Sequence, residues 1–357
     1  MRLHVVGGFL GSGKTTAIAS ATRQLMARGQ RVGIVTNDQG RHLVDTAFFR
    51  ALNAPAVEVT GGCFCCHYDD LDARLGQLEA DARPDVIFAE SVGSCADVVA
   101  TVIRPLLTLR RAPASLTVFA DARLLRQRLL GNALPFADDV VYIFDKQIEE
   151  AGLLVVNKAD LLAPAELDAT LALARAAHPA KAIRAQRSLD AASVAGWLAL
   201  LDQPAPLPDT ALAIDYDRYG AGEAALAWLD LDLALDVPAD AGRAAITALV
   251  GAACAAVSDS GLPVAHLKFF VRAGDQQAKI SVPALDAGGW AAQIPALPGG
   301  SVTMLVNARV QAGAAALHDT LLAALRAAAA AHGVAVRVRA SDSFHPGWPT
   351  PTHRMSP

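Results

Sequence analysis

The most informative stretch of this sequence lies near its N-terminus and reads Gly8-Phe9-Leu10-Gly11-Ser12-Gly13-Lys14-Thr15. It matches the Walker A pattern G-x-x-x-x-G-K-[ST], in which glycines let backbone N–H groups converge on a phosphate. An apolar run precedes it at residues 3–6, and a helix-forming run follows at residues 15–28. A strand, a glycine-rich loop and a helix in this order predict a nucleotide-binding loop with a phosphate at the helix N-terminus.

The residue types in this loop suggest separate roles. Lys14 is expected to reach the β- and γ-phosphates, and the hydroxyl of Thr15 is expected to bind Mg(II). The other candidates for contacting the nucleotide are Gly8, Gly11, Ser12, Gly13 and Thr16.

Short apolar runs recur outward from this loop, at residues 31–36, 56–60, 85–89, 116–120 and 152–156. Stretches long enough for helices lie between them, such as residues 71–82 and 146–151. Continuous apolar strands that alternate with helices are typical of a parallel sheet buried on both faces. We therefore expect an α/β fold over residues 1–202: a P-loop NTPase domain whose mostly parallel sheet is covered by helices on both faces.

A second domain is expected after a proline-containing linker at residues 203–222. Residues 226–236 alternate apolar and polar side chains, which predicts a strand whose exposed face carries Asp230, Asp232 and Asp236. Further strands are expected at residues 266–273, 279–282, 301–310 and 334–340, with helices at 241–258 and 314–331. This pattern predicts a smaller α+β domain over residues 223–357, with an irregular proline-rich tail after Ser341.

Two motifs follow strands of the first domain. Asn157-Lys158-Ala159-Asp160 matches N-K-x-D, and the Asp160 carboxylate can accept two hydrogen bonds from guanine that adenine does not offer. Glu90-Ser91-Val92-Gly93 places a carboxylate where P-loop enzymes hold Mg(II), with the Gly93 N–H positioned to sense a γ-phosphate. A helix N-cap at Asp160 and an ordinary turn at Glu90 are the structural alternatives.

Three cysteines stand within four positions, at Cys63, Cys65 and Cys66. Thiolates are soft ligands that suit Zn(II), Co(II) or Cu(I), and a tetrahedral Zn(II) would take one further donor. Candidates for that donor are Asp38, His42, His67 and Cys95. Redox chemistry between Cys63 and Cys65, and inert burial of all three thiols, remain open as alternatives.

Composition excludes several classes of protein. The chain is 53% hydrophobic with a net charge of -4, which rules out a disordered protein and gives no general attraction to nucleic acid or to an anionic membrane. The uncharged stretch at residues 244–258 is too short to span a bilayer, and no signal-peptide pattern begins the sequence. Five cysteines are too few for a disulfide framework, so we expect a soluble protein of the cytoplasm.

Taken in order, these motifs resemble the CobW-like metallochaperone GTPases, the group named after the cobalamin-synthesis W protein. The resemblance also includes Asn37-Asp38-Gln39-Gly40 leading to Asp45, Asp121, and Gln147-Ile148-Glu149. The first switch departs from the family's usual N-E-x-G-E, because Asp38 replaces the first glutamate and Arg41 the second. An arginine cannot bind a metal ion.

The resemblance implies slow hydrolysis of GTP to GDP and phosphate, coupled to delivery of Zn(II) or Co(II) to a client metalloprotein or cofactor pathway. The implied catalytic residues are Lys14, Asp45, Glu90 and Gly93, with Mg(II) on Thr15 and Glu90 and the transition metal on Cys63, Cys65 and Cys66. A homodimer is possible within this scheme. Two other functions stay open: a metal-responsive GTP-binding regulator with little hydrolysis, and a small-molecule kinase or ATPase.

Overall fold

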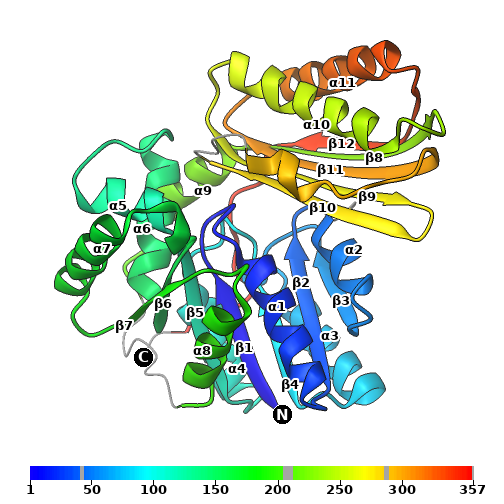
Figure 1. The fold of residues 1–357 in the computed structure, drawn as a ribbon. Coiled ribbons are helices and arrows are strands. Elements are labelled where there is room, and N and C mark those ends of the chain that lie inside the picture. The colour runs from blue at the N-terminus through cyan, green and yellow to red at the C-terminus, as the bar shows by residue number, and fades with distance from the viewer. Residues whose placement is uncertain (41–43, 204–211, 285–288, 356–357) are drawn as a thin grey trace. The chain divides into compact units, whose positions relative to one another are not determined.

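The structure is a computed structural model that describes residues 1–40, 44–203, 212–284 and 289–355. The chain divides into two compact units (Figure 1). Unit 1 comprises Met1–Gln39, Phe49–Gly222 and Trp348–Pro357, and unit 2 comprises Gly40–Phe48 and Glu223–Gly347. The domain bounds expected from the sequence stay a prediction; within the predicted linker, residues 212–222 belong to unit 1. The transfer of Gly40–Phe48 to unit 2 and of Trp348–Pro357 to unit 1 was not predicted.

Unit 1 is built on a seven-stranded parallel sheet in the order β3-β2-β4-β1-β5-β6-β7. Its strands are β1 (Arg2–Gly7), β2 (Val32–Asp38), β3 (Ala56–Thr60), β4 (Val86–Glu90), β5 (Ala114–Asp121), β6 (Leu153–Asn157) and β7 (Ala182–Gln186). Strands β4 and β6 are buried along their whole length, as expected of parallel strands covered on both faces. The predicted P-loop fold class is therefore confirmed.

Helices lie on both faces of this sheet (Figure 1). They are α1 (Lys14–Ala27), α3 (Tyr68–Ala82), η1 (a π-helix, Val99–Ile103), α4 (Arg104–Thr108), α5 (Ala122–Leu129), α6 (Asp138–Glu150), η2 (Ala159–Leu161), α7 (Pro164–Ala177), α8 (Ala191–Leu201) and α9 (Tyr216–Ala224). The chain runs from β1 outward to β3 and then back to β4, so right-handed crossovers place α1 and α3 on opposite faces. Because all seven strands are parallel, their carboxyl ends meet at one edge of the sheet, and the predicted motifs gather there.

Unit 2 contains a five-stranded antiparallel sheet in the order β10-β9-β11-β8-β12. Its elements are β8 (Ala227–Val237), α10 (Gly242–Asp259), β9 (Val264–Ala273), β10 (Gln276–Pro283), η3 (Gly289–Gln293), β11 (Gly300–Val310), α11 (Ala314–Ala331) and β12 (Ala335–Phe344). Helices α10 and α11 pack on one face and close a core of aliphatic side chains (Figure 1). The helix α2 (Val44–Arg50) begins in this unit and ends in unit 1.

One feature of the predicted strand at residues 226–236 is wrong. Asp230 is fully buried, and its carboxylate accepts hydrogen bonds from Arg309 and Asn307 at 2.8 Å each. The alternation places Asp232 and Asp236 toward solvent, but Asp230 lies where β8 is covered on both faces. The fully buried guanidinium of Arg309 neutralises the Asp230 carboxylate. Asp230 therefore forms an internal ion pair and does not belong to a solvent-exposed face of the strand.

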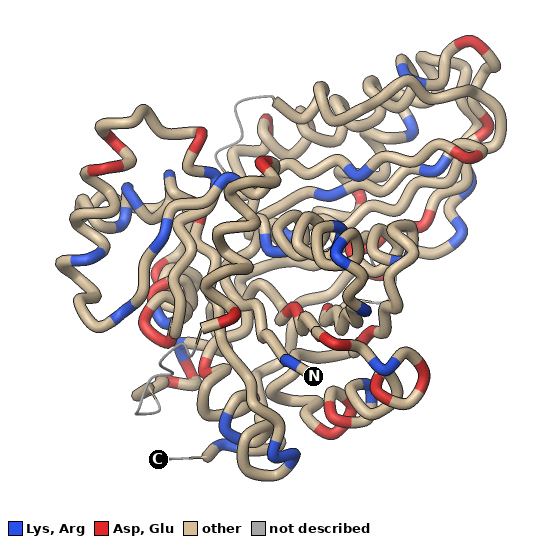
Figure 2. Tube along the Cα trace, turned by 60° about the horizontal axis from the view of Figure 1, so that its bottom comes forward, with Lys and Arg blue, Asp and Glu red and all other residues tan. Residues whose placement is uncertain are grey.

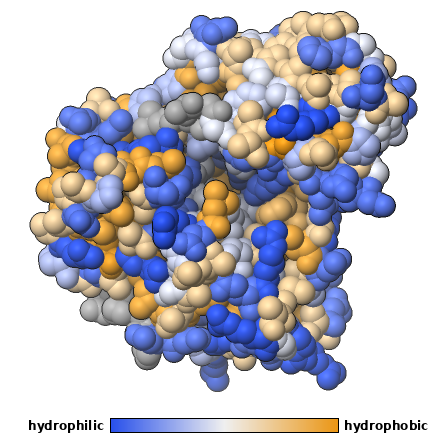
Figure 3. Space-filling model, in the orientation of Figure 1, coloured by the Kyte–Doolittle hydropathy of each residue, from blue (hydrophilic) through white to orange (hydrophobic). Residues whose placement is uncertain are grey.

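The surface carries charges of both signs. Figure 2 shows basic and acidic residues interspersed along the trace of each unit. Figure 3 shows apolar side chains on the side of unit 1 where α5 and α7 lie. Exposed leucines there are Leu130, directly after α5, Leu161 on η2 and Leu173 on α7. Among the described helices, none has the length and hydropathy required to cross a bilayer.

Candidate functional site

The loop between β1 and α1 has the backbone that phosphate binding requires. Gly8, Gly11 and Gly13 have φ angles of 122°, 74° and 93°, a region that favours glycine. A Cβ on Gly8 would lie 2.1 Å from the carbonyl oxygen of Phe119, so a side chain cannot be accommodated there. The loop therefore exposes its backbone to a ligand at the N-terminus of α1, where the helix dipole favours an anion.

Polar groups inside this loop suit a bound phosphate. The ammonium group of Lys14 donates to the carbonyl oxygens of Gly8, at 2.6 Å, and Phe9, at 3.3 Å. The hydroxyl of Ser12 is buried and has no hydrogen-bond partner among the described residues. A buried polar atom without a partner is rare in a folded protein and is explained by a ligand that the site is built to hold. Thr16 follows in the first turn of α1 and is half-buried.

The two residues predicted to hold Mg(II) lie together. The hydroxyl of Thr15 donates to Oε1 of Glu90 at 2.8 Å, and both side chains are buried. Glu90 ends β4, the neighbour of β1 in the sheet. A hydroxyl and a carboxylate at this spacing are oxygen donors of the kind that Mg(II) prefers, so the residues fit the predicted ion.

The loop after Glu90 touches the phosphate loop directly. A Cβ on Gly93 would lie 2.9 Å from Cα of Leu10, which shows how closely the two backbones approach. The side-chain amide of Gln147, on α6, donates to the carbonyl oxygens of Gly93 at 3.0 Å and Cys95 at 2.9 Å. The side-chain amide of Gln147 thus binds both ends of the segment from Gly93 to Cys95.

The N-K-x-D segment is joined to the phosphate loop as well. The amide of Asn157 donates to the carbonyl oxygen of Ser12 at 2.7 Å and accepts from the hydroxyl of Ser188 at 2.7 Å. Lys158 has a φ of 58°, and its ammonium group pairs with Asp121 at 2.9 Å. Asp160 lies on η2 with its side chain exposed, so its carboxylate is open to a ligand.

The ion pair of Asp121 is buried and electrostatically stabilised. Burial alone would raise the pKa of Asp121, but Lys158 and Arg123 outweigh burial and hold that pKa below its ordinary value. The charged carboxylate fixes the Lys158 side chain beside the loop that is predicted to bind the base. These ion pairs fix the shape of the predicted base-binding segment.

The three cysteines of the C-x-C-C segment form one cluster. Their sulfurs all lie within 4.8 Å of one another, with Cys63 Sγ 3.4 Å and Cys65 Sγ 3.7 Å from Cys66 Sγ. A tight turn produces this arrangement, because the amides of Cys66 and His67 both donate to the carbonyl oxygen of Cys63. Cys63 and Cys65 are buried and Cys66 is half-buried. The cluster can accept one soft metal ion.

The neighbouring thiols and burial favour the protonated forms of Cys65 and Cys66. Hydrogen bonding with the neighbouring thiols, together with burial, raises the pKa of Cys65 well above its ordinary value. Hydrogen bonding with Cys63 likewise contributes most to the raised pKa of Cys66. A metal ion must therefore displace protons from these sulfurs, which makes its affinity dependent on pH.

Asn37, at the end of β2, fixes the cysteine loop. Its side-chain amide donates to the carbonyl oxygens of Gly62 at 2.7 Å and Val59 at 3.1 Å, and its carbonyl oxygen accepts from the amide of Phe64 at 2.8 Å. The start of the predicted first switch and the cysteine segment therefore share a hydrogen-bonded connection inside unit 1. The sequence indicated Asn37 only as part of a family resemblance and not as this connection.

The other donors considered for the cluster have different surroundings. The imidazole of His67 lies 3.4 Å from the carboxylate of Asp70, and Asp38 is half-buried at the end of β2. Arg41 and His42 lie outside the described residues. Cys95 is buried, with its sulfur 3.9 Å from that of Cys65.

Asp45 is placed in unit 2. Its carboxylate pairs with the ammonium groups of Lys268, at 2.6 Å, and Lys279, at 2.8 Å. Burial alone would raise the pKa of Asp45, but these two cations hold it far below its ordinary value. The catalytic role predicted for Asp45 stays a prediction.

The contact between the C-terminal segment and the cysteine cluster was not predicted from the sequence. The amide of Thr350 donates to Sγ of Cys66 at 3.2 Å, and Thr352 donates from its amide to the carbonyl oxygen of Cys65 at 2.8 Å. The hydroxyl of Thr352 also donates to the carbonyl oxygen of Cys66 at 2.9 Å. An irregular tail offers no periodicity from which such a contact could be predicted.

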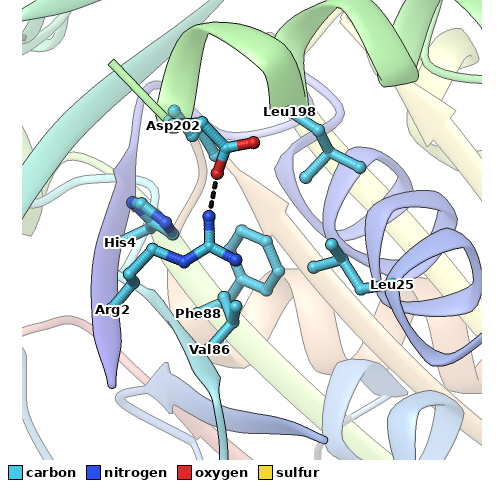
Figure 4. Close-up of a pocket in the computed structure, with 8 residues that line it drawn as sticks. Arg2, His4, Leu25, Val86, Phe88, Leu198 and Asp202 are labelled. Atoms are coloured by element: carbon cyan, nitrogen blue, oxygen red, sulfur yellow. Dashed lines mark hydrogen bonds and ion pairs between the residues drawn. The ribbon is translucent and has the colours of Figure 1, made fainter. Parts of the chain in front are cut away.

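A separate small pocket lies at the opposite edge of the sheet, where β1 and β4 begin (Figure 4). Its lining residues are Arg2, His4, Leu25, Val86, Phe88, Leu198, Leu201 and Asp202. Figure 4 shows the guanidinium of Arg2 directed at the carboxylate of Asp202, with which it pairs. The pocket is formed by the amino ends of strands, whereas the phosphate loop follows a carboxyl end.

About half of the chain is similar to known proteins. Residues 2–184, slightly more than half of the 357, match the family described as CobW/HypB/UreG, nucleotide-binding domain. The zinc chaperone CobW of Sinorhizobium sp. is 29% identical over 187 residues, with 44% of this chain and 51% of the relative covered. The zinc chaperone YeiR of Escherichia coli (strain K12) is 30% identical over 173 residues, with 46% and 48% covered. The chain thus spans about half the length of these curated relatives.

Among solved structures, this chain is similar to HypB from Helicobacter pylori in complex with nickel, and the match covers 56% of this chain and 85% of that chain. The sequence identity is 16% and the TM-score is 0.42.

Proposed function

The chain belongs to the CobW/HypB/UreG family of nucleotide-binding domains, and on that premise we propose that it is a metallochaperone driven by GTP hydrolysis. It binds a divalent transition metal through Cys63, Cys65 and Cys66 and delivers it to a client metalloprotein or cofactor pathway. The observation that carries this proposal is the cluster of three thiols in the same unit as a Walker A loop. A P-loop enzyme that acted only on small molecules would have no use for such a cluster.

The nucleotide is GTP in this proposal. The Asp160 carboxylate accepts two hydrogen bonds from guanine. The hydrogen bond from Asn157 to Ser12 keeps the N-K-x-D segment at a fixed distance from the phosphate loop. Lys14 exchanges its carbonyl partners for the β- and γ-phosphates. Thr15 and Glu90 hold Mg(II), which supplies positive charge to the phosphates during hydrolysis.

Coupling between nucleotide and metal follows from the shared connections. GTP orders the end of β2 and the Glu90–Gly93 loop through its γ-phosphate, and hydrolysis releases them. Asn37 transmits the order of β2 to the cysteine loop through its bonds to Gly62 and Phe64. If GTP tightens the metal site, metal must tighten GTP binding by the same factor.

Zn(II) is the proposed cargo, with Co(II) as the alternative. Thiolates favour both ions, and the two curated relatives described above are named as zinc chaperones. Hydrolysis is slow in the isolated chain and is accelerated by a client or by a second copy of the chain, because the motifs of this sequence assign no arginine to the transferring phosphate.

The test is a Co(II) titration of the metal-free full chain in the presence of a non-hydrolysable GTP analogue or of GDP. Thiolate-to-cobalt charge-transfer absorbance reports occupancy of the cysteine cluster. We expect about tenfold tighter binding with the GTP analogue, in the usual range of coupling free energies. Equal affinity in the two nucleotide states would overturn the coupling.

Two variants separate the proposal from its alternatives. Cys65→Ser removes a buried thiol and is expected to abolish the charge-transfer band while GDP binding persists. Asp160→Ala is expected to weaken guanine nucleotides without affecting adenine nucleotides; an unchanged preference would favour a kinase or ATPase. A metal-responsive regulator is favoured instead if Zn(II) fails to stimulate phosphate release.

A further inference from the structure

A fourth thiol lies beside the cluster. Cys95 belongs to the loop after β4 rather than to the C-x-C-C segment, and its sulfur is 3.9 Å from that of Cys65. Cys95 is buried, as are Cys63 and Cys65. Cys95 also contributes to the raised pKa of both Cys63 and Cys65. Four sulfurs from two separate segments of unit 1 therefore converge on one buried region.

The spacing matches the edge of a tetrahedral thiolate site. With Zn–S bonds of about 2.3 Å, the sulfurs of a tetrahedron lie about 3.8 Å apart. The observed separations are 3.4 Å for Cys63–Cys66, 3.7 Å for Cys65–Cys66 and 3.9 Å for Cys65–Cys95. The group of sulfurs within 4.8 Å of one another does not include Cys95, so at least one of its distances must shorten when an ion binds.

On the basis of this geometry, which rests on the proposed function, we propose that Cys95 is the fourth ligand of the metal ion. Each of the four thiols gives its proton to solvent as its sulfur bonds the ion, and the ion releases its bound water. The product is a closed site of four thiolates, the kind that holds zinc rather than exchanging it. With Cys95 withdrawn, three thiolates remain and the fourth position is open to a client's donor.

The position of Cys95 in the chain makes this ligand responsive to nucleotide. Cys95 lies two residues after Gly93, the predicted sensor of the γ-phosphate. Gln147 donates to the carbonyl oxygens of both residues, so they move together. Ordering of the Glu90–Gly93 loop by GTP brings Cys95 to the ion, and hydrolysis withdraws it. Capture and release of the metal then correspond to four and three protein ligands.

The experiment compares Cys95→Ser with the wild-type full chain, each loaded with Co(II) in the presence of the GTP analogue. We expect the charge-transfer absorbance per ion to fall by about a quarter, since one of four thiolate bonds is lost. Titration in buffers of different ionisation enthalpy should count about one proton fewer released per ion, because one thiol fewer is deprotonated. With GDP the two proteins should give the same spectrum.

Controls make each outcome decisive. Cys254→Ser changes the cysteine on α10 in unit 2 and should alter neither spectrum nor proton count. Unchanged GDP affinity in Cys95→Ser shows that unit 1 is folded. If Cys95→Ser matches wild type while Cys65→Ser loses the ion, the fourth ligand is not Cys95. If Cys65→Ser also keeps the ion, the proposed function itself fails.

Discussion

The imidazole of His4 lies in the first strand of unit 1, beside Arg2 and Phe88 (Figure 4). Its Nδ1 is 2.7 Å from the hydroxyl of Ser115, and its ring centroid is 5.7 Å from that of Phe88. Burial, followed by the positive charge of Arg2, lowers the pKa of His4 to about 4. The folded state therefore favours the neutral imidazole, and protonation of His4 destabilises the folded state.

His4→Gln is expected to flatten the acid side of the stability profile. In wild type the unfolded chain takes up a proton near pH 6.5 while the folded chain does so only near pH 4. His4 therefore contributes nothing to the pH dependence above about 6.5, and between these values it lowers the free energy of unfolding by up to about 1.4 kcal/mol per pH unit as pH falls. Urea unfolding at pH 7, 6 and 5 measures the difference. His332→Gln, at an exposed position, is the control; parallel curves for His4→Gln and wild type would contradict the expectation.

Motif spacing along the chain is enough to propose Lys14, Thr15, Glu90 and the three clustered cysteines as site residues. The structure brings Thr15 and Glu90 together and clusters the three sulfurs, while the roles of these residues stay predictions. The buried state of Asp230 was missed, because its pairing with Arg309 joins residues 79 positions apart. Such pairs depend on which strands become neighbours, and no local pattern encodes that.

The C-terminal segment, residues 348–355, contacts the cysteine loop of unit 1. Thr350 and Thr352 hydrogen-bond to the cysteine loop, and the guanidinium of Arg354 pairs with Asp97 at 2.7 Å. Met355 continues the contact by donating its amide to the carbonyl oxygen of Ala100. An N–H that donates to Cys66 Sγ stabilises the thiolate form of that sulfur. Docking of this segment and metal binding should therefore reinforce each other.

Thr352→Val tests that coupling. The substitution removes the hydroxyl that donates to the carbonyl oxygen of Cys66 and should cost about 1 kcal/mol of docking free energy. We expect the Zn(II) affinity, measured by competition with a chromophoric chelator, to fall by up to about fivefold. Amide hydrogen exchange across residues 348–355 should accelerate in the same variant. Thr352→Ser keeps the hydroxyl and should behave as wild type, so equal affinity in all three proteins would separate the tail from the metal site.

Elements were predictable from sequence where burial produces a continuous apolar run. The six strands at residues 3–156 and the two long helices of unit 2 follow this rule. Strand β7 was missed because it lies at the sheet edge, where Gln186 alone of its five residues is buried. The docked tail was expected to be irregular, which it is, but its hydrogen bonds to the cysteine loop depend on tertiary structure.

Across the whole molecule, the chain passes between the units more often than its linear motifs suggest. It leaves unit 1 after Gln39, contributes Gly40–Phe48 to unit 2, and returns at Phe49. Within unit 2 the amide of Val44 donates to the side chain of Asn307 at 2.9 Å, and Lys279 lies over the ring of Phe48. A segment that sequence assigned to the nucleotide-binding domain is thus held by the second sheet, with Asp45 as its charged anchor.

Asp45→Asn is expected to destabilise unit 2. The change leaves the ammonium groups of Lys268 and Lys279 without their counter-charge at a site where both are largely buried, and breaking such an arrangement costs about 3 kcal/mol. Because the pKa of Asp45 is depressed, its stabilising contribution is complete above the unfolded value near 3.8 and is lost as pH falls below it. Urea unfolding of the full chain at pH 7 measures the loss, and Lys279→Met added to Asp45→Asn should recover part of it.

Asp232→Asn is the matched control, since its pair with Arg339 is partly exposed and should be worth less than about 1 kcal/mol. The same variants decide between the two roles open to Asp45. A structural anchor lowers stability while GTP hydrolysis per folded molecule is retained. A catalytic residue would instead leave the unfolding midpoint unchanged and abolish phosphate release, and that result would show that the ion pairs with Lys268 and Lys279 do not hold the segment in solution.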